Sequence, residues 1–147
     1  MSTAYVPGRV SISQFLFTTL SAIPEVAALG PGHVWEGQAP AGVSGTVVVY
    51  QQVGPGRGVS PIGGQPVGAN YRFQWRVGHE GSSMVPLVPI AKAIQARLND
   101  ARNEVAADGN HISMTVITTD LPPLPVDDSG RPMQELGGEV EVFVNYT

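Results

Sequence analysis

Few residues of this 147-residue sequence have the types and spacing that carry out chemistry. The sequence holds no cysteine, which excludes disulfides, thiol nucleophiles and thiolate metal sites. Its three histidines, His33, His79 and His111, each fall near the end of an expected strand. His33 and Glu36 stand three apart on such a strand, so they face opposite sides and cannot hold one ion together. We therefore expect structural histidines and no metal site.

Two further motifs suggest chemistry only superficially. The glycine-rich run 54–58 (GPGRG) resembles a phosphate cradle, but such a cradle leads directly into a helix and needs a lysine followed by Ser or Thr. Here more loop and then a strand follow. The carboxylates Asp127 and Asp128 lie in a proline-rich loop, where nothing would shift their pKa values usefully. The serines lie in no nucleophile-elbow context. We expect no catalytic residue and no cofactor.

Charge and composition narrow the class of protein. The net charge is −4, with a single lysine, and the arginines are scattered rather than clustered. This argues against sequence-specific binding of nucleic acid. The N-terminus lacks the features of a secretory signal, and no apolar run is long enough to span a membrane. We expect a soluble protein made in the cytoplasm.

The elements that would position any site are those of a mixed fold. Residues 10–22 and about 85–106 show the apolar spacing of amphipathic helices, with a short turn at 24–29 after the first. Strands are expected at 33–36, 46–53, 70–77, 111–119 and 139–146. With 18 glycines and 13 prolines, the sequence favours strands joined by turn-rich loops. We predict one α+β domain over residues 1–147, a mostly antiparallel sheet of about four to five strands with two main helices packed on one face.

Two long loops interrupt these elements, at 54–69 and 120–134. Hairpin loops are usually two to five residues long, so segments of this length are either surface excursions or functional arms. We favour arms that become ordered against neighbouring chains. The candidate interface residues in these loops are Arg57, Val59, Ile62, Leu121, Leu124, Asp127, Asp128 and Arg131.

Four charged residues on expected strands complete the candidate interface: Arg72, Arg76, Glu139 and Glu141. Each pair lies on one face of its strand because residues two apart in a strand share a face. If the two strands are neighbours in one sheet, the charges pair across strands and contribute a few tenths of a kcal/mol each, roughly. If the strands lie at opposite edges, the charges could instead match between adjacent subunits and set their register.

Several short motifs follow one another in an order that has a counterpart among known proteins. They are 24–29 (PEVAAL), 33–42 (HVWEGQAPAG), 47–50 (VVVY), 71–77 (YRFQWRV), 90–98 (IAKAIQARL) and a final strand ending at Tyr146. In this order the sequence resembles the tail terminator, or tail completion, proteins of long-tailed bacteriophages and related gene-transfer particles. The glycine-rich segment 54–69 is longer than in the shorter members of that family.

The resemblance implies a structural role without chemistry. Such proteins are α+β domains that assemble as a hexameric ring on the finished tail tube, at the head-proximal end of the tail. The ring stops tube growth and presents the surface that joins the head. The implied partners are further copies of the chain, the tail tube protein and a head-side connector or stopper protein. The resemblance also allows genome DNA to pass through the ring.

Two alternatives remain open on the sequence. One is another neck component, such as a head-closure or connector subunit. The other is a small ligand-binding or hydrolytic α+β domain, which should show a concave pocket with converging polar groups and shifted pKa values. A ring subunit should instead show protruding loops and flat flanks of mixed polarity.

Overall fold

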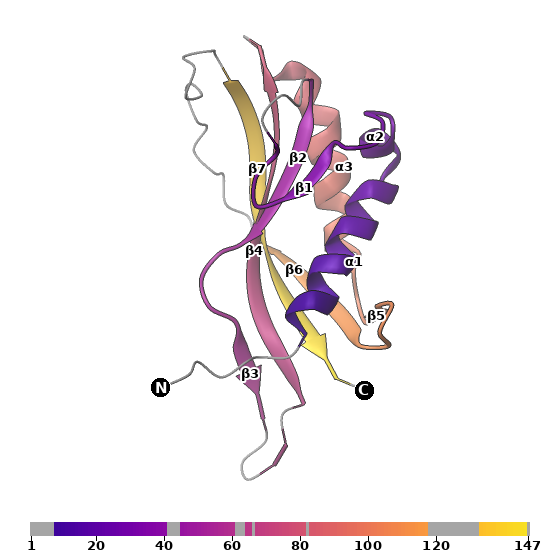
Figure 1. Ribbon diagram of the computed structural model, residues 1–147, viewed down its shortest axis with the longest axis vertical. Coiled ribbons are helices and arrows are strands. Elements are labelled where there is room, and N and C mark those ends of the chain that lie inside the picture. Colours follow the sequence, from indigo (N-terminus) through magenta and orange to yellow (C-terminus); the bar gives the residue numbers. More distant parts are fainter. Residues whose placement is uncertain are drawn as a thin grey trace.

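The computed structural model describes residues 8–40, 45–60, 64–65, 67–81, 83–117 and 133–146. Three α-helices and one 3₁₀ turn lie on one side of a single twisted sheet (Figure 1). In chain order the elements are α1 (Arg9–Ala22), α2 (Pro24–Ala27), β1 (Val34–Glu36), β2 (Val47–Gln52), β3 (Arg57–Val59), β4 (Gly68–Glu80), η1 (Val85–Leu87), α3 (Val88–Asn99), β5 (Glu104–Val105), β6 (His111–Ile117) and β7 (Met133–Asn145). None of these helices is both long enough and apolar enough to cross a membrane.

Over the described residues the sheet has seven strands, in the order β1-β2-β4-β7-β6-β5, and β3 pairs with the first residues of β4, beyond the end of β2. Every pairing is antiparallel except that of β1 with β2. The α+β class and the mostly antiparallel sheet are therefore confirmed, whereas the expected size of four to five strands is wrong. The extra strands β3 and β5 are two or three residues long and have little strand character of their own. Their partners, β4 and β6, supply the template on which they pair.

One face of the sheet packs against the helices and forms the core. Along β4 the side chains of Tyr71, Phe73, Trp75 and Val77 are all buried, as their alternation with polar residues predicts. The apolar stripes of the helices cover them: Ile12, Leu16 and Leu20 from α1, and Ile90, Ile94 and Leu98 from α3. Each buried side chain of this size contributes about 1.5–3 kcal/mol to folding.

The helix ends depart in part from the prediction. Pro24, which has no amide hydrogen, ends the first helix and opens the short α2, as expected. The second helix was expected to run to Ala106 and does not. It begins as a 3₁₀ turn and ends at Asn99, and Asn103 then adopts a positive φ of 52°. Over the described residues the chain has three α-helices, one of them only four residues long, where two main helices were expected.

An ion pair ties the segment after α3 to the helix. The Arg97 guanidinium donates two hydrogen bonds to the Glu104 carboxylate, at 3.0 and 2.8 Å. Glu104 can then pair with Ile112 as part of β5. Bidentate pairing of this kind fixes geometry as well as adding energy, which explains why the chain leaves the helix here despite an apolar spacing that continues.

β4 and β7 approach each other closely at a pair of glycines. A Cβ on Gly137 would lie 2.2 Å from the Trp75 carbonyl oxygen, whereas one on Gly138 would lie 3.4 Å or more from the indole ring of the same residue. Gly137 thus permits the backbone approach, and Gly138 leaves ordinary contact distance for the indole. The two glycines allow the two longest strands to pair through the middle of the sheet.

Replacing Gly137 with Ala should lower stability by about 1–3 kcal/mol, because the strands must separate to admit the methyl group. Gly138→Ala is the matched control and should cost about 1 kcal/mol or less. Urea unfolding of both variants measures the difference. Equal losses in the two variants would contradict the close approach at Gly137.

Candidate assembly interface

The sheet face opposite the helices carries the predicted charges. Arg72 is in register with Glu141, and Gln74 with Glu139. Arg72 Nε lies 3.9 Å from Glu139 Oε2, so its contact runs diagonally between the strands. The strands are neighbours, so the cross-strand alternative is confirmed for Arg72, and matching of these charges across opposite sheet edges is wrong.

Arg76 has a partner that the sequence did not indicate. Its Nη1 donates a hydrogen bond of 3.0 Å to Glu135 Oε2, and the two side chains are only 20% and 16% exposed. Arg72, by contrast, is 52% exposed, so solvent screens its ion pair more strongly. Glu135 lies in the first part of β7, before the expected strand at 139–146, which is why its pairing was missed.

A cavity of about 510 Å³ lies on this outer face beside the Arg76–Glu135 pair. Its other walls come from Val47, Val49 and Gln51 of β2, Gln74 and Gly78 of β4, and residues 37–39. The mixture of apolar, amide and charged groups is the mixed polarity expected of a contact flank. As interface residues, Arg72, Arg76, Glu139 and Glu141 remain predictions.

The loop expected at 54–69 contains part of a β-hairpin. β3 pairs with the first residues of β4, and the Val67 amide donates to the Val59 carbonyl oxygen at 2.8 Å. We call residues 57–60 and 67–70 the arm; it lies at one end of the molecule's long axis (Figure 1). Val59 and Val67 are 37% and 44% exposed. Arg57 is also exposed and makes no ion pair with a described residue.

The base of the arm is held firmly to the sheet. The Val53 amide donates to the Arg72 carbonyl oxygen at 2.8 Å. Gly56 lies against the Tyr71 ring, where a Cβ would come within 2.2 Å. The predicted interface residues Arg57 and Val59 therefore lie on a positioned hairpin. The remaining predicted residues lie outside the described residues: Ile62, Leu121, Leu124, Asp127, Asp128 and Arg131.

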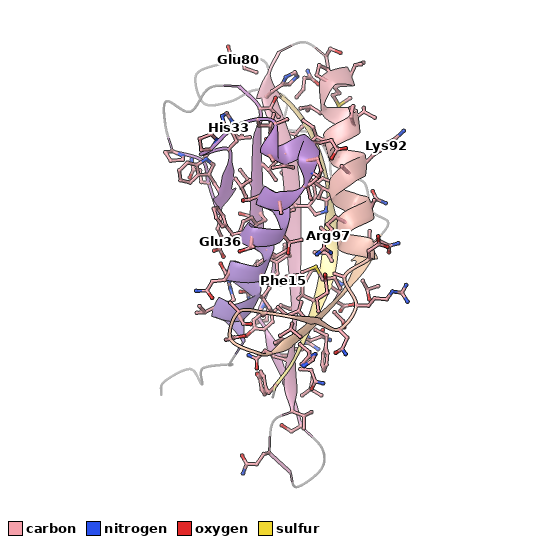
Figure 2. All side chains as sticks on the ribbon, turned by 90° about the vertical axis from the view of Figure 1, so that its right-hand side faces the viewer. Phe15, His33, Glu36, Glu80, Lys92 and Arg97 are labelled. Atoms are coloured by element: carbon pink, nitrogen blue, oxygen red, sulfur yellow. The ribbon has the colours of Figure 1, made fainter. Side chains whose placement is uncertain are left out.

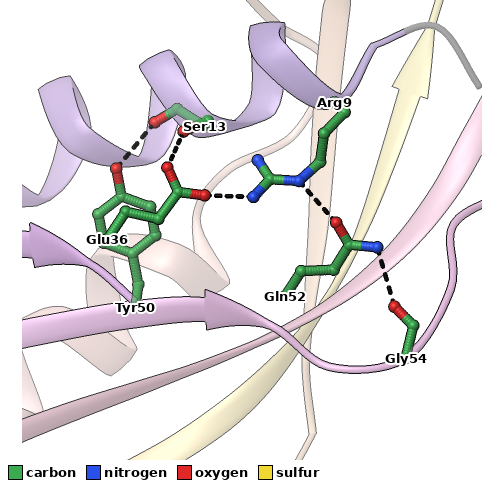
Figure 3. Close-up of polar contacts among 6 residues, drawn as sticks. All are labelled: Arg9, Ser13, Glu36, Tyr50, Gln52 and Gly54. Atoms are coloured by element: carbon green, nitrogen blue, oxygen red, sulfur yellow. Dashed lines mark hydrogen bonds and ion pairs between the residues drawn. The ribbon is translucent and has the colours of Figure 1, made fainter. Parts of the chain in front are cut away.

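A polar cluster joins the start of α1 to β1 and β2 (Figure 3). Arg9 forms an ion pair with Glu36 and donates to Gln52 Oε1 at 2.6 Å. Its guanidinium also lies 5.0 Å from the centroid of the buried Phe73 ring, within the range of a cation–π contact. Ser13 donates to the second oxygen of Glu36. The cluster fixes where α1 sits on the sheet.

Two pKa values shift in this cluster. Burial alone would raise the pKa of Glu36, but the hydrogen bonds from Ser13 and Arg9, together with the Arg9 charge, lower it overall. Burial raises the pKa of Tyr50, whose hydroxyl donates to the Ser13 carbonyl oxygen at 3.1 Å. Both pKa shifts follow from burial and from the contacts among Arg9, Ser13 and Glu36 that hold α1 on the sheet. No sequence pattern indicated the cluster, because Arg9 and Glu36 are 27 residues apart.

An apolar groove of about 550 Å³ lies between the helices and the edge strand β1. We call it the α2 groove. The buried side chains of Val26 and Tyr50 contribute to its lining, and Phe17, Ala27 and Trp35 line it further. The Trp35 indole donates to the Gly32 carbonyl oxygen at 2.8 Å, which holds the ring in place.

Two of the three histidines, His33 and His79, make hydrogen bonds to backbone carbonyl oxygens, which fits a structural role. His33 Nδ1 is 2.6 Å from the Thr46 carbonyl oxygen, and His79 Nε2 is 2.7 Å from that of Ser83. His33 lies just before β1 and Glu36 is the last residue of that strand, while Lys92 points from α3 into solvent (Figure 2). Within the part of the chain that the structure describes, no three His, Asp or Glu side chains group closely enough to hold a metal ion.

Comparison with known proteins gives a fold and no family. No family model matches the sequence, and no curated protein matches it. A chain of the solved virion of a native gene transfer agent particle shares the fold with a TM-score of 0.59 at 17% identity, covering 89% of this chain and 92% of that one. A second solved chain aligns with a TM-score of 0.55 at 14% identity, covering 95% of this chain and 94% of its own length. At these identities the likeness shows the architecture alone.

Replacing Glu36 with Gln should cost about 1 kcal/mol at pH 7, because it removes the charge that Arg9 pairs with at a partly exposed site. A carboxyl whose pKa is lowered by folding stabilises the protein above its unfolded value of about 4.5, and this contribution is lost as the pH falls through the lower folded value. The difference between wild type and variant should therefore shrink towards pH 3.

Urea unfolding at pH 7 and pH 3 measures this dependence. Glu25→Gln is the matched control, since Glu25 is exposed and makes no ion pair with a described residue. A loss of stability in Glu36→Gln that is the same at both pH values would contradict the role of the charge.

Proposed function

We propose that this chain is a structural protein of a phage-like particle and, within that class, its tail terminator. It would form a ring that caps the tail tube, stops its elongation and presents the surface for head joining. The observation that carries the proposal is the likeness of fold to a chain from a gene transfer agent virion, over about nine-tenths of both chains. The motif order in the sequence, from the PEVAAL turn to the final strand, supports the finer assignment.

The surface suits such a role. A positioned arm projects at one end of the long axis, and the outer sheet face carries ion pairs closed within the chain. Flanks of mixed polarity and projecting elements suit contacts between subunits. A head-to-tail contact closes into a ring when its rotation allows, without any large self-complementary patch.

The ring is a homo-oligomer, a hexamer by the family resemblance, with the tail tube protein on one side and a head-side connector or stopper on the other. It lies at the head-proximal end of the tail in the virion, and genome DNA passes through its centre. The proposal assigns the chain no catalytic residue, cofactor or membrane contact.

Particles assembled without this protein should show free filled heads beside tails of uncontrolled length in electron micrographs, because only the growth stop and the joining surface are lost. Expression of the wild-type chain in trans should restore tails of one length. Leaking heads beside tails of normal length would move the protein to the head side of the joint. Intact, infectious particles would overturn the structural role altogether.

A further inference from the structure

Two exposed surfaces of this chain are complementary to each other but lie apart in the molecule. The arm offers Arg57 and Val59, two residues apart on β3, which places both side chains on one face of the strand. The α2 groove is mainly apolar, and α2, which borders it, carries the exposed carboxylate of Glu25. The arm lies at the opposite end of the long axis from α2 (Figure 1).

The arm carries an exposed cation and partly exposed apolar side chains. Arg57 makes no ion pair with the described residues, while Val59 and Val67 remain more than a third exposed. Within the described part of the chain, β3 pairs only with β4, so its second edge is open. An exposed strand edge with apolar side chains is suited to pairing with another chain.

The α2 groove carries the matching features. Val26 and Ala27 of α2 line it, and Glu25 precedes them on the same helical turn. Glu25 is exposed and has no ionic partner among the described residues. Phe17, 48% exposed, extends the apolar lining towards α1. Glu36, the carboxylate in the lining of the groove, is already hydrogen-bonded to Arg9 and Ser13. Glu25, next to the lining residue Val26 in the chain, is therefore the carboxylate available to a partner.

We propose that the arm of one copy docks in the α2 groove of a second copy, with Val59 in the apolar trough and Arg57 facing Glu25. Charge complementarity commits the groove to this occupant. The arm brings a cation without an ionic partner among the described residues beside apolar side chains, and α2 carries a carboxylate likewise without an ionic partner among them, next to the apolar residues Val26 and Ala27 that line the groove. Because the two surfaces differ and lie apart, the contact is head-to-tail. This inference rests on the proposed ring and adds to it the contact that joins neighbouring subunits.

Cross-linking in a chain free of native cysteine tests this contact. Chains carrying Val59→Cys and chains carrying Ala27→Cys are mixed and treated with a short bismaleimide, and the joined peptides are identified by mass. Ala96→Cys, exposed on α3, replaces Ala27→Cys as the matched control. We call the peptides joined between positions 59 and 27 the 59–27 product, and those joined between positions 59 and 96 the 59–96 product. We expect the yield of the 59–27 product to exceed that of the 59–96 product about tenfold, the ratio that a specific contact of modest strength gives.

Charge reversal in the same chains makes the test specific to the ion pair. Arg57→Glu in the first chain, or Glu25→Arg in the second, should lower the 59–27 yield at least about threefold, and both together should restore it. Equal yields at positions 27 and 96, or a yield indifferent to charge reversal, would overturn the proposed contact.

The contact and the function can fail separately. A chain that restores tail length in trans but gives no 59–27 product overturns the contact alone. If the cross-linked product forms but particles assembled without the chain have normal tails and infectivity, the role in the particle alone is overturned.

Discussion

The pairing of β4 with β7 along 13 residues is the interaction on which the other features depend. Its helix-facing side supplies Phe73, Trp75 and Val142 to the core, and its outer side holds the two arginine–glutamate contacts. β4 also extends past the end of its pairing with β2, and that extension is the template for β3 and hence for the arm. Gly137 permits the strands to approach closely at Trp75. The contacts on both faces of the sheet therefore depend on this glycine.

A small domain that serves as a building block needs elements that are rigid before they meet a partner, since ordering on contact costs affinity. Here the polar cluster around Arg9 holds α1 on the sheet, and Gln52 within it donates to the Gly54 carbonyl oxygen at 2.8 Å, just before the arm begins. The Val53 amide and the Tyr71 ring add two further anchors at the same place. The arm is thereby presented in a set direction, which is what the proposed contact between subunits requires.

Much of the fold could be predicted from the sequence because it is encoded locally. The alternation from Tyr71 to Val77 identified the central strand and its buried face, and Pro24 marked the end of the first helix. The charges of Arg72 and Glu139 allow either a cross-strand contact or a match between subunits, and the strand order decides for the first. The end of α3 was missed because an apolar spacing continues past Asn99, while the residues that terminate the helix act through an ion pair and a turn.

The rest of the site depends on register and long-range contacts, which no local pattern encodes. Arg76 meets Glu135 only because β7 begins at Met133, before its recognisable strand sequence. Arg9 and Glu36 are joined by the packing of α1 on β1. β3 forms within a glycine-rich segment of low strand propensity because β4 provides its hydrogen bonds.

We propose that copies of this chain form a ring at the junction between tail and head. Electron cryo-microscopy of assembled particles, with the chain enlarged by a small fused domain as a label, tests it most directly. The account predicts a closed ring of six labels around the head-proximal end of the tube. Labels distributed along the tube or at the distal tip, or particles that contain no label, would contradict it.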